Sequence, residues 1–241
     1  MSKLTVIRHA QASLMKADYD QLSDLGHEQA ALLGKYLANQ EVEFDKIYLG
    51  TLKRHQQTAD YILAAFEAKG KPFPVQKMEL LNEHQSPKVA RWMLERALSD
   101  EEAPHLEELR KMIAKVDTSI PKKQYLTIFD YASSLWAKGE IDATTIGIAS
   151  YETFKNRIHQ ALEQILTATT KGQYIAIVTS GGPSAVITGK ALNLDNEKIM
   201  ELNSIIQNAA MSEFLFSNHR FSLHRFNMVP HLVEDRLLTY V

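Results

Sequence analysis

The chain has 241 residues, of which 45% are hydrophobic and 23% are charged, as expected of one large globular domain or one domain with a sizeable insertion. Lysine and arginine number 27 and aspartate and glutamate 29, and this net charge of −2 lacks the basic excess of a typical nucleic-acid-binding protein. Cysteine is absent, which excludes disulfides, thiol catalysis, zinc–thiolate sites and iron–sulfur clusters. No apolar run approaches the roughly 18 residues that span a bilayer. The first apolar run stops at Arg8 and His9, so we expect no signal peptide, no membrane association and a cytoplasmic location.

The first predicted elements are a buried strand and an amphipathic helix. Residues 4–7 are apolar and rich in β-branched side chains, as in a buried strand. Arg8 and His9 follow at once, and two such side chains are costly after a buried strand unless the strand end opens on a site. Ser23 can cap a helix that continues to residue 39, because small and apolar residues recur there at helical spacing.

A second strand, a helix and a third strand come next. Residues 44–49 predict a strand, and residues 52–68 predict a helix with one apolar face. Arg54 lies in the first turn of that helix, where a cation opposes the helix dipole. A cation there is tolerable if it is exposed, or useful if an anion lies nearby. Residues 75–81 predict a third strand, which ends just before Glu83.

The stretch 86–149 is predicted to be a helical insertion rather than an independent domain. Ser86 and Pro87 mark a sharp helix start, with a cap residue followed by proline at the first helical position. The pattern beyond them is helical but irregular, and Pro104 and Pro121 interrupt it. No strand is indicated in this stretch.

Alternating elements return after the insertion. Ser150 can cap a long helix to residue 169, and residues 174–178 predict a strongly apolar strand. This strand ends in a glycine-containing turn at residues 179–183, and a helix to residue 192 follows. A strand, a glycine turn and a helix together present backbone N–H groups to an anion.

The C-terminal part predicts a β-hairpin, with strands at 211–216 and 221–227. Strands that alternate with long helices indicate a three-layer α/β/α sandwich with a mostly parallel sheet, to which the hairpin adds antiparallel character. Because a hairpin at the end of a sheet exposes a strand edge, and such edges invite pairing, a homodimer is an open alternative.

Several polar groups are predicted to gather at the carboxyl ends of the strands, where open α/β sheets bind ligands. They are Arg8, His9, Arg54, Glu83 and the turn 180–182. Arginines match phosphate oxygens, a histidine can be a nucleophile, and a carboxylate can shuttle a proton. Taken singly, each is more typical of an ordinary surface loop or helix. Together they favour a phosphate ester as the ligand.

These residues lie in motifs that resemble the histidine phosphatase superfamily, in its phosphoglycerate-mutase-like branch. The first motif is Thr-Val-Ile-Arg-His-Ala-Gln-Ala-Ser at 5–13, where the family has a strand followed by Arg-His-Gly. The other similar stretches are 22–34, 47–59, 81–83, 175–182, 208–209, 226–227 and 231–232. The resemblance covers most of the chain, and only the helical insertion lacks specific motifs.

The resemblance implies a phosphohistidine mechanism that needs neither a metal nor an organic cofactor. His9 would carry the phosphoryl group, and Glu83 would protonate the leaving oxygen and then accept a proton from the attacking water. Charge on the phosphoryl oxygens would be offset by arginines. The implied phosphate-binding residues are Arg8, Arg54, Ser180, Gln11, Ser13 and Gly181.

Two positions depart from the family pattern. Ala10 replaces the usual glycine, which matters only if the backbone there needs a positive φ. Ser180 stands where the family has a second histidine. A serine can donate a hydrogen bond to a phosphoryl oxygen, but it brings no positive charge, so we expect reduced activity. His55 or His84 is an alternative source of an imidazole, although we expect both to be exposed.

Ser180 also follows a strand and precedes a helix, as the nucleophile of an α/β-hydrolase does. That alternative is disfavoured, because the glycine two residues before the serine is absent.

We therefore expect a phosphatase acting on a small-molecule phosphate ester. The alternatives are a catalytically weak phosphate-ester binding or regulatory protein, motivated by Ser180, and a phosphoglycerate mutase. The mutase is disfavoured because residues 14–16 and 84–86 lack the mutase-type residues expected there. The substrate is not specified by the sequence. The insertion offers candidate contacts to the leaving group, although packing is the more typical role of its tryptophans: Arg91, Trp92, Lys122, Lys123, Tyr125 and Trp136.

Overall fold

The computed structural model describes residues 1–13, 20–40, 43–99, 104–113 and 122–240. The chain divides into two compact units, one formed by Met1–Glu83 with Lys155–Val241 and the other by His84–Phe154. The predicted insertion, 86–149, falls within the second unit. Residues 14–16 and Pro121, which entered the sequence argument, lie outside the described residues.

The first unit is built on one six-stranded sheet in the order β3-β2-β4-β1-β5-β6. Its strands are β1 (Ser2–Arg8), β2 (Lys46–Leu49), β3 (Val75–Lys77), β4 (Tyr174–Thr179), β5 (Met211–Ser217) and β6 (Arg220–Met228). The four strands from β3 to β1 pair in parallel, and β5 and β6 form an antiparallel hairpin beside β1. The mostly parallel sheet and the hairpin are as predicted.

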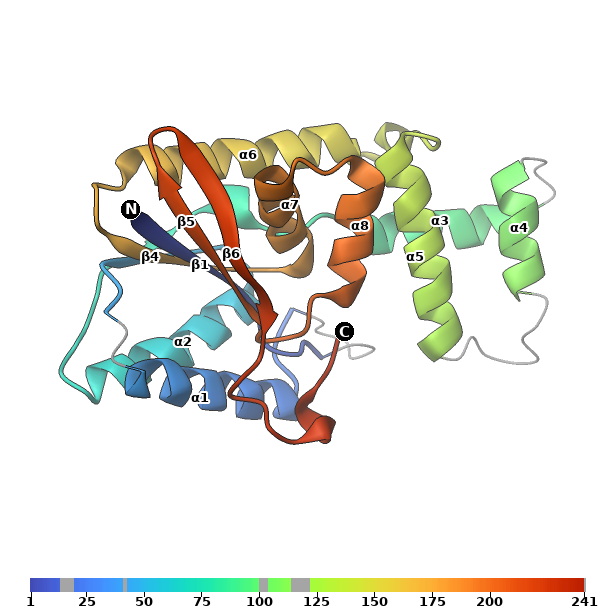
Figure 1. Ribbon diagram of the computed structural model, residues 1–241. Helices are drawn as coiled ribbons and strands as arrows, with labels where there is room; N and C mark the ends of the chain where they lie inside the picture. The colour runs from blue at the N-terminus through green and yellow to red at the C-terminus, as the bar shows by residue number, and fades with distance from the viewer. Residues whose placement is uncertain (14–19, 41–42, 100–103, 114–121, 241) are drawn as a thin grey trace. The chain divides into compact units, whose positions relative to one another are not determined.

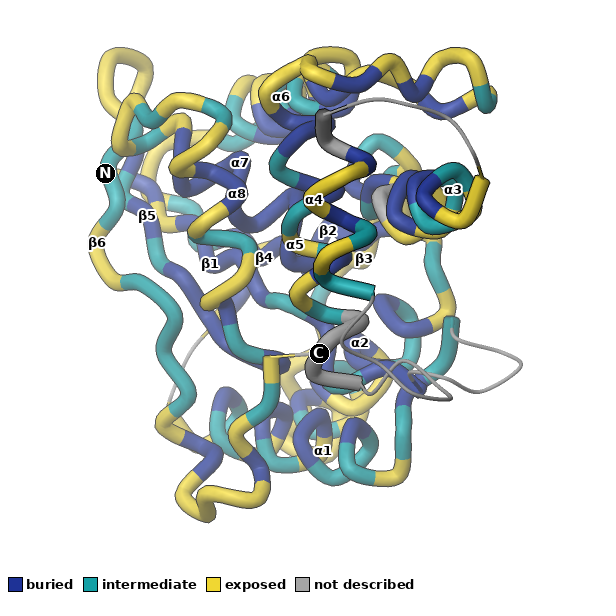
Figure 2. The backbone as a smooth tube through the Cα atoms, turned by 90° about the vertical axis from the view of Figure 1, so that its right-hand side faces the viewer, coloured by how far each residue is buried: buried dark blue, intermediate teal, exposed yellow. Residues whose placement is uncertain are grey.

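Helices cover both faces of this sheet and give a three-layer α/β/α fold (Figure 1). One face carries α1 (Asp24–Asn39) and α2 (Lys53–Glu67), and the other carries α6 (Tyr151–Ala168) and α7 (Gly181–Leu192), with α8 (Asn196–Ile205) beside α7. In Figure 2 the central strands β1 and β4 are buried, whereas the edge strand β6 is largely intermediate or exposed.

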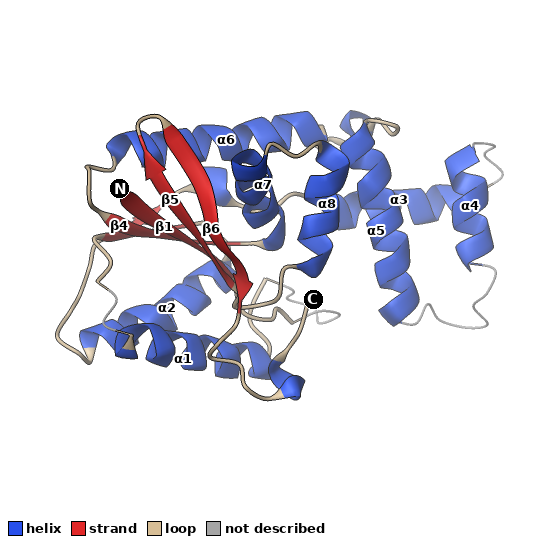
Figure 3. Cartoon of the chain, viewed as in Figure 1, coloured by secondary structure: helices blue, strands red, loops and turns tan. Residues whose placement is uncertain are grey.

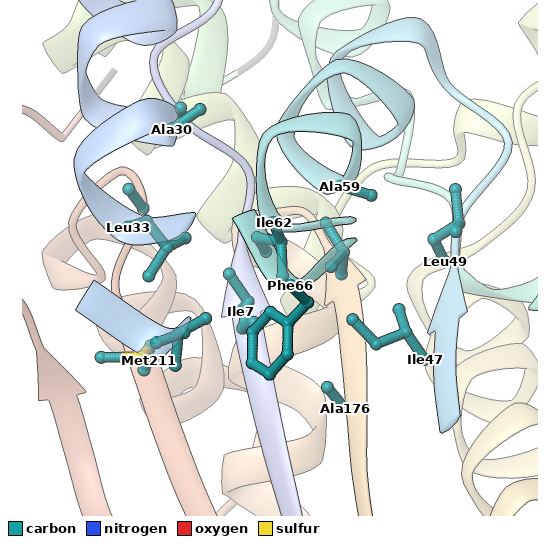
Figure 4. Packing of buried hydrophobic residues seen from close by; sticks show 14 of the residues in the cluster. Ile7, Ala30, Leu33, Ile47, Leu49, Ala59, Ile62, Phe66, Ala176 and Met211 are labelled. Atoms are coloured by element: carbon teal, nitrogen blue, oxygen red, sulfur yellow. The ribbon is translucent and has the colours of Figure 1, made fainter. Parts of the chain in front are cut away.

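The core between the sheet and the α1–α2 layer is built from side chains that alternate along the strands. Ile7 and Ala176 of the central strands meet Ile62 and Phe66 of α2, and Leu33 of α1 packs into the same cluster (Figure 4). All five are buried. This packing fixes α2 against the carboxyl half of the sheet, and therefore fixes the first turn of α2 beside the strand ends.

Most predicted elements are confirmed, and one strand prediction was partly wrong. The Ser23 side chain caps α1 by accepting from the Gly26 N–H. The third strand stops at Lys77, and Glu79–Leu81 forms a 3₁₀ turn instead. The strand lies at the exposed edge of the sheet, and the turn carries Leu81 into the core, where it is fully buried. The helix α8 was not predicted; the Asp195 side chain caps it.

The second unit contains α3 (Ser86–Ala97), α4 (Pro104–Ile113) and α5 (Lys122–Lys138), and its described residues include no strand (Figure 3). The predicted helix start is close but its cap is shifted, because Gln85 rather than Ser86 is the N-cap residue. Pro87 lies in the first turn, where its missing N–H costs no intrahelical hydrogen bond.

Candidate active site

The carboxyl ends of β1 and β4 lie side by side, with Arg8 in register with Thr179. The His9 N–H donates to the Thr179 carbonyl at 2.7 Å, and the Arg8 N–H donates to the Ala210 carbonyl at 3.0 Å. These backbone bonds extend the sheet by one residue beyond β1. They place Arg8 and His9 at the same edge as Ser180, the residue that follows β4.

Hydrogen bonds fix the protonation state of His9. Its Nδ1 lies 2.6 Å from the Ala10 carbonyl oxygen. A carbonyl oxygen only accepts, so Nδ1 carries the hydrogen and Nε2 carries a lone pair. Arg54 Nε donates to that Nε2 at 3.1 Å. Burial, followed by the charge of Arg54, holds the pKa of His9 well below its usual value of 6.5, so the imidazole is neutral at neutral pH.

Ala10 fits without strain. It is fully buried, and its N–H donates to the Thr58 hydroxyl of α2 at 3.1 Å. Among the described residues other than glycine, only Asn193, Ala209 and Asn227 have a positive φ. The backbone at Ala10 therefore makes no demand for glycine, and the departure from the family pattern is structurally minor.

Arg54 extends from the first turn of α2 and links His9 to a carboxylate. Besides its bond to His9, its Nη1 pairs with Asp20 Oδ1 at 2.8 Å, and the Arg54 side chain is only 7% exposed. Asp20 Oδ2 also accepts from the Lys53 N–H at 3.0 Å. Asp20 thus offsets the buried charge of Arg54 and supports the start of α2. Nothing in the sequence around Asp20 indicated this role.

Arg8 lies against the start of α7. Its guanidinium donates to the Ile206 carbonyl, and a Cβ at Gly181 would lie 3.5 Å from Arg8 Cζ and 2.6 Å from Asn203 Oδ1. Glycine at 181 therefore leaves room for two polar side chains at the helix N-terminus, where backbone N–H groups favour an anion.

Glu83 also contacts this helix start. Its Oε2 accepts from the Gly182 N–H at 3.0 Å. The segment before it is held by Arg157 of α6, whose guanidinium donates to the carbonyls of Leu80 at 2.9 Å and Asn82 at 2.8 Å. Arg157 therefore sets the position of Glu83. Sequence analysis missed Arg157, because a lone arginine in a long helix carries no distinguishing signal.

His55 does not follow the expectation of an exposed helix histidine. It is fully buried, its Nε2 lies 2.6 Å from Ser180 Oγ, and its ring centroid lies 5.6 Å from that of His9. The expectation of exposure was also wrong for His84, which is 8% exposed. His84 belongs to the second unit, where its ring packs against Trp136 and Phe154 at 5.3 and 5.1 Å between centroids.

Gln11 and Ser13 join the loop after β1 to the start of α1. Gln11 Oε1 accepts from the Ser23 hydroxyl at 2.8 Å, and the buried Ser13 hydroxyl donates to the Leu22 carbonyl at 3.0 Å. Both side chains therefore shape the loop. Their predicted contact with phosphate stays a prediction.

The insertion residues show local contacts. Arg91 pairs with Glu95 on an exposed helix face, Arg96 lies over the Trp92 ring at 4.5 Å, and Trp136 is buried among aromatic rings. Lys122, Lys123 and Tyr125 belong to α5, but their side chains lie outside the described part of the structure.

Among the residues that the structure describes, no cluster of three or more histidine, aspartate or glutamate side chains is arranged to hold a metal ion. Within the same residues, no helix combines the length and apolar character needed to cross a bilayer.

The chain is similar to known proteins both in sequence and in structure. A stretch of 58 residues is 43% identical to the mitochondrial serine/threonine-protein phosphatase Pgam5 of Caenorhabditis briggsae and spans 24% of this chain and 20% of that protein. A mutant phosphoserine phosphatase from Entamoeba histolytica, solved in complex with phosphoserine, matches with a TM-score of 0.63 at 20% identity, over 97% of this chain and all of that one. A phosphoglycerate mutase from Bacillus anthracis str. Sterne matches with a TM-score of 0.63 at 17% identity, over 95% and 94% of the two chains.

The two structural matches establish the fold. The sequence itself matches the family model over residues 4–91 and 94–229, which include every strand-end residue described above. This chain therefore belongs to the histidine phosphatase superfamily, branch 1.

Proposed function

We propose that this protein is a phosphomonoesterase that works through a phosphohistidine on His9. The observation that carries the proposal is the state of His9 Nε2. The Nδ1 hydrogen is committed to the Ala10 carbonyl, so the Nε2 lone pair is available as a nucleophile once a phosphoryl group replaces it as the partner of Arg54.

The first half of the reaction transfers the phosphoryl group to His9. Nε2 forms a bond to phosphorus as the bond from phosphorus to the ester oxygen breaks. Arg8 and Arg54 offset the charge on the phosphoryl oxygens. The departing oxygen takes a proton from the Glu83 carboxyl group and leaves as an alcohol.

The second half releases phosphate. A water molecule gives a proton to the Glu83 carboxylate and bonds to phosphorus, and the bond from phosphorus to Nε2 breaks. His9 returns to its neutral form, Glu83 is protonated again, and inorganic phosphate departs. The Gly182 N–H that holds Glu83 Oε2 keeps the carboxyl group at the helix start in both halves.

Two further observations support a phosphatase rather than a mutase. The stretch shared with Pgam5 of Caenorhabditis briggsae belongs to a protein named as a serine/threonine-protein phosphatase. The residues after Glu83 are His-Gln-Ser, without the arginine expected of a mutase. A small-molecule phosphate ester as substrate, a cytoplasmic location and a homodimer stay predictions.

The test is hydrolysis of p-nitrophenyl phosphate between pH 5 and 8, with mass spectrometry of rapidly quenched enzyme. Wild type should turn over and show a peptide containing phosphorylated His9. His9→Ala should lose at least about 10⁴-fold in kcat/KM and show no phosphopeptide. His219→Ala, on the exposed hairpin turn, is the matched control and should equal wild type.

The binding-protein alternative predicts a different result. Wild type would then bind inorganic phosphate or an aryl phosphate in calorimetry but give neither turnover nor a phosphopeptide. That outcome would replace the phosphatase proposal with a phosphate-ester binding role.

A further inference from the structure

A second imidazole lies beside His9, and it is hydrogen-bonded to the residue at the end of β4. His55 Nε2 lies 2.6 Å from Ser180 Oγ, and both residues are fully buried. The His55 and His9 rings are 5.6 Å apart, with 38° between their planes. Burying two imidazoles next to arginine is costly. The reaction described above uses only one of them, so the other requires an explanation.

The surroundings of His55 keep its ring in one place. A Cβ at Gly50 would lie 2.2 Å from His55 Nδ1, so the ring uses the space that a side chain at position 50 would fill. Next to it, the Asn82 side chain accepts from the Thr51 N–H at 2.7 Å and donates to the Thr51 hydroxyl at 2.7 Å, which holds the loop before α2. The ring is therefore confined between this loop and Ser180.

The chemical state of His55 suits a neutral hydrogen-bond donor. Burial, followed by the charge of Arg54, holds the pKa of His55 well below 6.5, so the ring is neutral at neutral pH. The buried Nδ1 of His55 has no hydrogen-bond partner, so a hydrogen on that atom would leave an N–H group unpaired. The tautomer with its hydrogen on Nε2 avoids this, and in that tautomer the ring donates to Ser180 Oγ. A hydroxyl has one donor and two acceptor positions, so this bond leaves the Ser180 hydrogen available for another acceptor.

We propose that His55 is a positioning residue, which orients the Ser180 hydroxyl so that it donates to an oxygen of the phosphoryl group transferred to His9. The inference rests on the proposed function, since it concerns the same reaction. Its consequence is that the imidazole acts through serine, and that this imidazole comes from the first turn of α2 rather than from the end of β4.

The arrangement also changes what a histidine at position 180 would do. Ser180 has no exposed surface, and its hydroxyl already touches the His55 ring. An imidazole at position 180 would need the volume that His55 occupies. Ser180→His alone should therefore lower activity, whereas the expectation from sequence alone was that serine is only a handicap.

The experiment compares His55→Leu with His55→Gln, Ser180→Ala and the double variant His55→Leu/Ser180→Ala. Leucine fills much of the ring volume without a donor, whereas the glutamine amide retains one. We expect His55→Leu and Ser180→Ala each to lower kcat about 10²-fold, with KM within a few-fold. The double variant should be no worse than either single variant, because both remove the same contact. His55→Gln should recover part of the loss.

Relocation of the imidazole gives an independent arm. His55→Ala/Ser180→His should have a higher kcat than both His55→Ala and Ser180→His, because the first substitution vacates the volume that the second needs. Ile165→Ala, fully buried near the C-terminal end of α6, is the control: it should lower Tm and leave kcat unchanged.

Two results would overturn the inference. One is His55→Leu with wild-type kcat, and the other is a double variant whose loss is the product of the two single losses. If wild type shows turnover that depends on His9 in the same assays, such a result removes only the role of His55. If wild type shows no His9-dependent turnover, the proposed function fails and this inference falls with it.

Discussion

The carboxyl ends of β1 and β4 are neighbours in the sheet, but they supply the site in different ways. β1 ends at Arg8 and is followed directly by His9, so the strand end itself provides a charge and an imidazole. β4 continues into Ser180, whose partner His55 comes from the first turn of α2. A strand end can therefore receive its imidazole from a neighbouring helix, provided that core packing holds that helix against the sheet.

The largest loss of activity should come from removing the charge of Arg54, which contacts His9 at the end of β1. Arg54→Ala should lower kcat/KM for p-nitrophenyl phosphate by about 10³- to 10⁵-fold, because arginine offsets the charge of the transferred group. Lys53→Ala removes a cation from the same turn but an exposed one, and should change the rate little. Comparable losses in both variants would mean that Arg54 acts only through general electrostatic attraction.

A smaller loss is expected from the proton shuttle at the β4 end. Glu83→Gln should lower kcat by about 10²- to 10⁴-fold with an alkyl phosphate, whose leaving group needs a proton. The loss should be smaller with p-nitrophenyl phosphate, because p-nitrophenolate departs without one. The control is Glu79→Gln, an exposed neighbour. An equal loss with both substrates would show that Glu83 does not protonate the leaving oxygen.

Gly50→Ala tests whether the position of the His55 ring against Ser180 matters for activity. The added methyl group would push the His55 ring off Ser180, and we expect a loss of about 10- to 100-fold in kcat, as for other residues that orient a functional group. The matched measurement is the same substitution in His55→Ala, where the ring is absent and only the contact of the added methyl group with Asn82 Oδ1 at 2.9 Å remains, so the loss should be much smaller. A loss of the same size in that background would place the cause in the loop itself.

The two imidazoles should make similar contributions to acid sensitivity. Both are held neutral in the folded protein, and the unfolded chain takes up a proton at each below about pH 6.5. The free energy of unfolding should therefore fall as pH drops below 6.5, by about 1.4 kcal/mol per pH unit for each histidine. Urea denaturation between pH 7 and 5 should give a shallower slope for His9→Gln and for His55→Gln. An unchanged slope in either variant, equal to that of His219→Gln, would contradict the neutral state of that ring.

The contribution of β1 to the site could be predicted from sequence, because it depends on residue order. A buried strand that stops at Arg8 and His9, and a helix that starts near Arg54, place these side chains at one edge of any parallel sheet. The same reasoning predicted Glu83, although β3 ends earlier than expected. The sequence could therefore predict the features of the site that depend only on the order of residues along the chain.

The contribution of β4 could not be predicted in this way. The burial of His55 depends on the missing side chain at Gly50 and on the small side chain at Ser180, far along the chain. Asp20 and Arg157 are similar, because each acts on a residue from a different element. Such pairs are indicated by packing alone, and single-residue expectations of exposure were wrong for His55 and His84 for the same reason.

The space beside Gly50 has a consequence for how this sequence can change. The His55 ring lies against both position 50 and position 180, so substitutions at these three positions depend on one another. A histidine entering position 180 first would collide with His55, and any side chain entering position 50 first would displace it. A change from an imidazole at position 55 to one at position 180 should therefore begin with the loss of His55. For the same reason, a homologue with a larger residue at position 50 should also lack histidine at 55.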